Sequence, residues 1–278
     1  MSRPIALTVA GSDSSGGAGI QADLKTFSAL GVYGASVITA LTAQNTLGVQ
    51  GVHAVPADFV TAQLASVLSD LDVRAAKTGM LATADIISAV ARDMALRPAV
   101  PLVVDPVMVA TSGDLLIAPE AVDVLARELL PVAALVTPNL AEAARLSGRP
   151  EARTRAEMET QAQALVGAGC RAVLVKGGHL AEAPDEAADY LLMADGGTWL
   201  VGRRIATPHT HGTGCTLSAA IVVGLATGLA MSEAVAAAKA YLASALAAAS
   251  SLGIGRGRGP VDHLHAMPGG PVTVARQP

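Results

Sequence analysis

Two glycines, a threonine and a cysteine form a short segment whose consecutive backbone N–H groups can converge on one point. The segment is Gly212, Thr213, Gly214 and Cys215; it follows a loop containing Pro208 and leads into a long apolar helical pattern. Glycines permit a tight turn, and a helix N-terminus favours negative charge. This geometry suits an anion, above all a phosphoryl group in transfer. We call residues 212–215 the anion loop.

Cys215 brings to the anion loop a side chain that could act as a base or nucleophile. It lies where it could touch a substrate hydroxyl. A position at a helix N-terminus favours the thiolate, so we expect the pKa of Cys215 to lie below the free value of about 8.5. Such a thiolate could accept the hydroxyl proton.

Three apolar, strand-like runs end in side chains that suit a metal–phosphate complex. Asp105 ends one run, Asn139 and Glu142 follow the next, and Lys176 ends a third. Carboxylates and phosphates are the usual ligands of Mg²⁺. Structural roles are equally open, because Asp105 could cap a turn, and Asn139 with Glu142 has the spacing of a capping box. Lys176 is an unusual end for an apolar run, which favours a phosphate contact.

A glycine-rich loop, residues 11–19, separates the first predicted strand from the first predicted helix. It lacks the Gly-Lys-Ser/Thr of a P-loop, since its first lysine is Lys25. It also lacks the ribose-binding carboxylate of a dinucleotide site, because no acidic residue lies between Asp23 and Asp58. The loop alone is as consistent with a structural turn as with a ligand site.

Short β-branched runs alternate with longer helical patterns, which indicates a doubly wound, mostly parallel α/β sheet with helices on both faces. The predicted strands are residues 5–10, 35–42, 73–78, 102–105, 134–137 and 172–176. The predicted helices are residues 20–30, 57–71, 83–96, 119–130, 140–146, 156–167, 216–227 and 232–251. Residues 190–193 and 198–201, joined across Asp195-Gly196-Gly197, predict a small antiparallel hairpin at one edge. We expect a single domain over residues 1–267 and a loose tail over residues 268–278.

Composition narrows the class of protein. The chain has 278 residues, of which 51% are hydrophobic and 15% charged, and a net charge of −4. It contains no basic block, which argues against a nucleic-acid partner. The two cysteines make no disulfide framework, and a reducing cytoplasm is their simplest location. We expect no membrane span; the closest segment, residues 217–231, falls short of about 20 apolar residues.

Taken together, these segments resemble the hydroxymethylpyrimidine/phosphomethylpyrimidine kinases of thiamine synthesis, within the ribokinase-like superfamily. The resemblance covers roughly residues 5–267. It rests on residues 10–23, 39–46, 78–81, 105–108, 137–140, 175–179 and 211–215.

The resemblance implies a doubly wound sheet, a homodimer, and ATP and Mg²⁺ as co-substrates. It implies that Gln44 hydrogen-bonds an aminopyrimidine in a pocket also lined by Gly11, Asp23, Met80 and Val107. Asp105 and Glu142 would serve the magnesium–phosphate complex, with Asn139 and Lys176 on ATP. The anion loop would hold the transferring phosphoryl group. Many superfamily members have aspartate at the position of Cys215, which leaves the base open.

The implied reaction is phosphorylation of 4-amino-5-hydroxymethyl-2-methylpyrimidine and then of its monophosphate. A pyridoxal-type vitamin kinase is the nearest rival. A Cys215 hydrolase or acyltransferase, assisted by His209 or His211, is a rival from a different class of enzyme. A non-catalytic pyrimidine-binding protein is the third rival. We expect structural or surface roles for His263 and His265.

Overall fold

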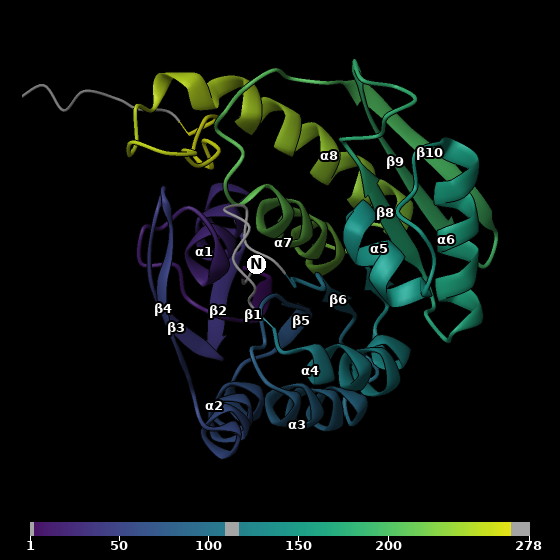
Figure 1. Ribbon diagram of the computed structural model, residues 1–278. Coiled ribbons are helices and arrows are strands. Elements are labelled where there is room, and N and C mark those ends of the chain that lie inside the picture. The colour runs from purple at the N-terminus through teal and green to yellow at the C-terminus, as the bar shows by residue number, and fades with distance from the viewer. Residues whose placement is uncertain (1–2, 109–116, 268–278) are drawn as a thin grey trace, which may run out of the picture.

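A computed structural model describes residues 3–108 and 117–267, and the predicted tail lies outside them. An eight-stranded mixed sheet crosses the molecule in the order β10-β9-β8-β7-β6-β5-β1-β2 (Figure 1). Six of its strands are parallel: β1 (Ile5–Ala10), β2 (Tyr33–Ile38), β5 (Val73–Thr78), β6 (Leu102–Val104), β7 (Leu135–Val136) and β8 (Val173–Gly177). Antiparallel β9 (Glu186–Met193) and β10 (Gly196–Arg203) complete one edge, which confirms the predicted hairpin in longer form.

Helices cover both faces of the sheet. They are α1 (Gly19–Ala29), α2 (Ala57–Asp70), α3 (Ala84–Ala95), α4 (Pro119–Val124), α5 (Leu140–Ser147), α6 (Arg155–Gly167), α7 (Thr213–Ala226) and α8 (Met231–Ala248). After α4 the helix continues as one π turn, Leu125–Leu129. The fold class expected from the sequence is therefore confirmed.

Alternate residues of each strand feed two separate cores, as the two-residue period of a covered strand requires. In β6, Val104 packs into the core formed with α2 to α6, whereas Val103 packs into the core formed with α1, α7 and α8. In β7, Val136 likewise packs into the first of these cores and Leu135 into the second.

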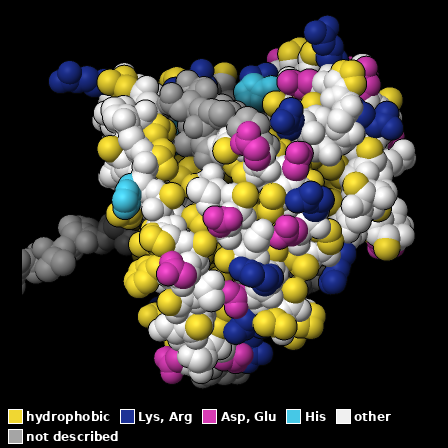
Figure 2. All heavy atoms as spheres, turned by 60° about the horizontal axis from the view of Figure 1, so that its bottom comes forward, with side chains coloured by type: hydrophobic (Ala, Val, Ile, Leu, Met, Phe, Trp, Pro, Cys, Tyr) yellow, Lys and Arg dark blue, Asp and Glu magenta, His cyan; other side chains and the backbone are white. Residues whose placement is uncertain are grey.

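On the outer face of the molecule that carries α2, α3 and α4, acidic and basic side chains are interspersed with apolar ones (Figure 2).

A second hairpin was missed by the sequence reasoning, which extended one strand over residues 35–42. β2 ends at Ile38, because both backbone groups of that residue bond to the side chain of Gln63. The Ile38 N–H donates to Gln63 Oε1, and Gln63 Nε2 donates to the Ile38 carbonyl. The chain then forms β3 (Ala40–Asn45) and β4 (Gly48–Ala54), an antiparallel pair beside the β2 end of the sheet (Figure 1).

Among the residues that the structure describes, one helix is long and apolar enough to span a membrane: Met231–Ser251, which contains α8. The segment expected to come closest, residues 217–231, is not that helix. Ala234, Val235 and Ala238 of α8 lie in the same core as α7. These contacts make α8 an outer layer over α7.

Candidate active site

Side chains from two strand ends form an ion pair at the carboxyl edge of the sheet. The Lys176 ammonium, in β8, lies 2.9 Å from Asp105 Oδ1, just after β6. Thr137, just after β7, donates to the same Asp105 oxygen at 3.2 Å. Burial alone would raise the pKa of Asp105 and lower that of Lys176. Their mutual attraction and hydrogen bond, together with the charge of Lys77 near Asp105 and that of Glu142 near Lys176, outweigh burial and shift both pKa values the opposite way. Both side chains therefore stay charged at neutral pH.

The anion loop lies directly against this pair. A Cβ at Gly214 would be 3.3 Å from both Asp105 Oδ2 and Lys176 Nζ, so the backbone approaches the two charges closely. The loop forms the first turn of α7, which begins at Thr213 rather than at the predicted Thr216. Gly212 caps the helix with φ 79°, and its carbonyl accepts the Thr216 N–H at 2.8 Å. The Thr213 N–H donates to Thr210 O at 3.3 Å. The Gly214 and Cys215 N–H groups lie in the first turn, where the helix itself supplies no acceptor, so they can serve an anion beside Lys176.

Asn139 and Glu142 form the capping box that the sequence allowed. Glu142 N donates to Asn139 Oδ1 at 2.9 Å, and Asn139 N donates to Glu142 Oε2 at 2.8 Å. Glu142 is nevertheless buried next to charged groups. Burial raises the pKa of Glu142 to about 7, with Lys176 opposing and Asp105 reinforcing the rise. Glu142 is therefore both a structural cap and an acidic neighbour of Asp105.

The expectation of a Cys215 thiolate is wrong. Burial raises the pKa of Cys215 to about 11, and the Asp23 and Asp105 charges add to the rise. Lys77 and a hydrogen bond from the Gly19 N–H act in the other direction but do not outweigh burial. The helix N-terminus is thus overridden by desolvation, and Cys215 is a neutral thiol near pH 7.

The glycine-rich loop is organised around its own carboxylate. Asp13 Oδ1 accepts hydrogen bonds from Ser15 N and Oγ, and Oδ2 accepts from Gly17 N and Ala18 N, at 2.7–3.1 Å. These N–H groups are therefore already satisfied inside the loop. The segment therefore forms the structural turn that the sequence allowed, and contact of this loop with a ligand stays a prediction.

A buried ion pair lies close to Cys215, and one of its partners, Lys77, was missed by the sequence reasoning, whereas Asp23 was assigned to the pocket by resemblance. Lys77 Nζ is 2.8 Å from Asp23 Oδ1, and Thr8 donates to Asp23 Oδ2 at 2.6 Å. Neither charged side chain is exposed. The signal was present in the sequence, because Lys77 interrupts the apolar run of β5 much as Lys176 ends that of β8.

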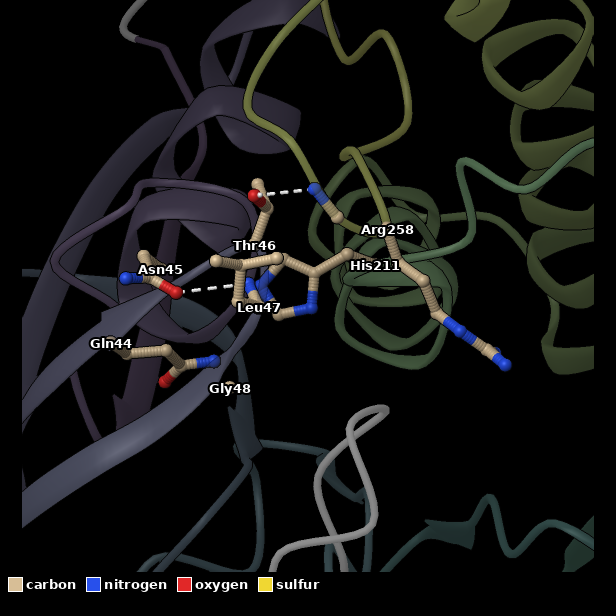
Figure 3. Close-up of a pocket in the computed structure, with 8 residues that line it drawn as sticks. Gln44, Asn45, Thr46, Leu47, Gly48, His211 and Arg258 are labelled. Atoms are coloured by element: carbon tan, nitrogen blue, oxygen red, sulfur yellow. Dashed lines mark hydrogen bonds between the residues drawn. The ribbon is translucent and has the colours of Figure 1, made fainter.

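A cavity of about 240 Å³ lies between the β3–β4 turn, His211 and the loop that carries Arg258 (Figure 3). Its lining residues are Gln44, Asn45, Thr46, Leu47, Gly48, His211, Gly257 and Arg258. Backbone contacts join its two walls, since Thr46 O accepts the Arg258 N–H at 3.1 Å. The Thr42 hydroxyl lies 2.8 Å from Ser12 O and 3.1 Å from Gln44 Oε1, so the Gln44 amide lies beside the start of the glycine-rich loop.

Of the five residues assigned to the pyrimidine pocket by resemblance, Gln44 alone lines this cavity. Gly11 and Met80 lie against each other at the ends of β1 and β5, where the Gly11 N–H donates to Met80 O at 3.1 Å. Val107 is half-buried just beyond Asp105, and Asp23 is enclosed by its pair with Lys77. Contact of any of these residues with a pyrimidine stays a prediction.

The remaining histidines differ in burial. His263 is buried, with Nε2 3.1 Å from Thr216 Oγ1, and the ring of His265 packs on Tyr241. Both positions fit the structural roles expected from the sequence. His211, by contrast, reaches Asp13 and lines the cavity.

Residues 13–262 match the family model of phosphomethylpyrimidine kinase. A hydroxymethylpyrimidine/phosphomethylpyrimidine kinase of Rhizobium meliloti is 60% identical over 261 residues, which cover 94% of this chain and 97% of that protein. The crystal structure of phosphomethylpyrimidine kinase from Clostridium difficile superposes with a TM-score of 0.77 at 41% identity, covering 88% of this chain and all of that one. An ADP complex of Bacillus subtilis pyridoxal kinase superposes with a TM-score of 0.85 at 39% identity, covering 94% and 98% of the two chains. The chain belongs to the phosphomethylpyrimidine kinase family.

Proposed function

We propose that the protein transfers the γ-phosphoryl group of ATP to the hydroxymethyl oxygen of 4-amino-5-hydroxymethyl-2-methylpyrimidine, and then phosphorylates the monophosphate to the diphosphate. One observation carries the proposal: the first turn of α7 lies against the Asp105–Lys176 pair. A Cβ added at Gly214 would be 3.3 Å from Asp105 Oδ2 and from Lys176 Nζ. Helix N–H groups and a buried ammonium together neutralise the charge of a phosphoryl group in transit.

In this reaction the substrate hydroxyl forms a bond to the γ-phosphorus while the bond from that phosphorus to the β-phosphate oxygen breaks, releasing ADP. Lys176 and the anion loop balance charge on the transferring group. A loose transition state needs little removal of the hydroxyl proton until late, so a neutral Cys215 thiol is compatible with it. Gln44 offers both a donor and an acceptor, which match the exocyclic amine and a ring nitrogen of an aminopyrimidine.

Mg²⁺ fits the residues present. Across residues 3–108 and 117–267, no three His, Cys, Asp or Glu side chains gather as a metal site. Mg²⁺ commonly binds through one or two carboxylates together with substrate phosphates, and Asp105 and Glu142 supply two. Their mutual repulsion, which contributes to the raised pKa of Glu142, would be relieved by a cation. We propose these two side chains as its protein ligands, and Asn139 with Lys176 as contacts of the nucleotide.

The test is a phosphorus NMR time course with ATP, Mg²⁺ and the pyrimidine alcohol. The proposal requires loss of ATP, growth of ADP and successive appearance of a phosphate monoester and a diphosphate. Consumption of ATP without a phosphorylated pyrimidine would refute it.

Pyridoxal phosphorylation is the second candidate, because the Bacillus subtilis pyridoxal kinase superposes better than the phosphomethylpyrimidine kinase from Clostridium difficile. Initial rates measured with the pyrimidine alcohol and pyridoxal in competition distinguish the two candidate activities.

We also propose a cytoplasmic homodimer on the basis of the family resemblance. Sedimentation equilibrium tests the dimer: a single species of about twice the monomer mass is expected, and a monomer at all concentrations would refute it.

A further inference from the structure

His211 and Asp13 form a buried pair that connects two loops far apart in the sequence. His211 Nε2 lies 2.7 Å from Asp13 Oδ2, and both side chains are almost completely enclosed. Burial alone would raise the pKa of Asp13, but hydrogen bonds from His211 and Ser15 hold that pKa well below its ordinary value. Asp13 is therefore a charged acceptor throughout the neutral range, and the pair persists there.

Each partner holds one side of the anion loop. Asp13 organises the glycine-rich loop through Gly17 N and Ala18 N, at 3.1 and 2.8 Å. His211 immediately precedes the anion loop, and its own N–H donates to Gly259 O at 3.1 Å. The two loops touch so closely that a Cβ at Gly17 would clash with the His211 ring, and one at Gly212 would clash with the Gly17 carbonyl. Their relative position therefore has little freedom.

The same two loops meet again at Cys215. Gly19, at the end of the glycine-rich loop, lies close enough to Cys215 for its backbone N–H to lower the pKa of the thiol. The two loops therefore meet at two places, the Asp13–His211 bond and the approach of Gly19 to Cys215. Loss of the Asp13–His211 bond removes the first of these connections, so the loops can shift relative to each other at Cys215.

We propose that His211 is a positioning residue, which acts through Asp13 to hold the anion loop and the Cys215 sulfur in register with the glycine-rich loop. This inference rests on the proposed kinase activity. It assigns His211 no contact with the reacting atoms. A displacement of about 1 Å in such a site can cost on the order of 100-fold in rate, so the effect belongs in kcat.

The test compares His211→Leu with His211→Gln, because the Gln amide can place a donor near the position of Nε2. We expect His211→Leu to lower kcat about 100-fold while the Kd of ATP changes less than about threefold, and His211→Gln to recover most of the loss. His209→Leu, in the same loop but without a bond to Asp13, is the matched control. It should leave kcat within about threefold of wild type.

Alkylation of Cys215 by iodoacetamide, located by peptide mass spectrometry, provides a readout that needs no kinase activity. At pH 9 we expect faster labelling in His211→Leu than in wild type or His211→Gln, because the half-buried Cys215 becomes more accessible when the two loops separate. Equal labelling rates in all three would overturn the proposal, as would equal kcat losses for Leu and Gln. If wild type transfers no phosphate, the proposed function fails, and the labelling pattern still decides whether His211 positions the sulfur.

Discussion

The Lys77 ammonium lies 2.8 Å from the Asp23 carboxylate, and neither side chain is exposed to solvent. Burial of each charge opposes ionisation, and the pair survives because each partner satisfies the other. Asp23 is further held by Thr8. The pair also lies close enough to Cys215 to act on the pKa of its thiol, which Lys77 lowers and Asp23 raises.

Removing one partner of this pair should destabilise the fold strongly. Lys77→Met leaves the Asp23 carboxylate buried and uncompensated, and we expect a loss of about 3–5 kcal/mol in the free energy of unfolding. Urea denaturation measures it. The double variant Lys77→Met, Asp23→Asn should lose less than the single one.

Arg74 supplies the control from the same strand. It pairs with Asp72 at 2.6 Å, but its side chain is 61% exposed. Arg74→Met should cost at most about 1 kcal/mol. If Arg74→Met and Lys77→Met lower the free energy of unfolding equally, burial does not make the Lys77–Asp23 pair more important for stability than an exposed pair.

Gln44 should control the choice of substrate. Gln44→Leu leaves polar groups of a bound pyrimidine unpaired, at a cost of about 1–3 kcal/mol, which corresponds to roughly 5- to 150-fold in kcat/KM. We expect this loss for the pyrimidine and little change in the KM of ATP. Steady-state kinetics with each substrate varied measures both.

Gln50, on β4 of the same hairpin, is exposed, and its amide donates to Gly48 O at 2.8 Å. Gln50→Leu should leave both kinetic constants unchanged. Comparable losses for pyrimidine and ATP in Gln44→Leu would remove Gln44 from the substrate pocket.

Glu142 should act through the metal as well as through its capping box. Gln retains the hydrogen bond to Asn139 N but loses the charge. Glu142→Gln should therefore fold with a near-normal melting temperature, turn over much more slowly and require more Mg²⁺. The Mg²⁺ concentration for half-maximal rate measures the last effect.

Glu157 forms an equivalent capping box with Thr154 at the start of α6. Glu157→Gln separates capping from metal binding, and it should leave the Mg²⁺ requirement unchanged. A lowered melting temperature with an unchanged Mg²⁺ titration in Glu142→Gln would restrict Glu142 to its structural role.

The pH dependence of Cys215 should follow its burial. Because the pKa of Cys215 is raised to about 11, the thiol is neutral at pH 7 to 9 and ionises only as the pH rises toward 11. Alkylation at Cys215 should therefore increase about tenfold per pH unit over that range without reaching a plateau. A plateau near pH 8.5 would mean that the helix N-terminus, not burial, sets the pKa.

Local sequence determined most elements of this protein and the edge at which its site forms. Periodicity of apolar residues marks strands and helices because strands alternate their faces and helices repeat about every 3.6 residues. The positions of Asp105, Glu142 and Lys176 after or at the ends of apolar runs placed them on one edge, since parallel strands end together. The β3–β4 hairpin was not predicted, because the end of β2 at Ile38 depends on Gln63, which lies 25 residues away in the sequence.

Only the tertiary structure decided which side chains of the site pair with each other and whether Cys215 is ionised. Asp13 and His211 are separated by 198 positions, and Lys77 and Asp23 by 54, so no local pattern pairs them. The pKa of Cys215 was mispredicted for the same reason. A helix N-terminus can be read from neighbouring residues, whereas desolvation depends on every segment that packs around the sulfur.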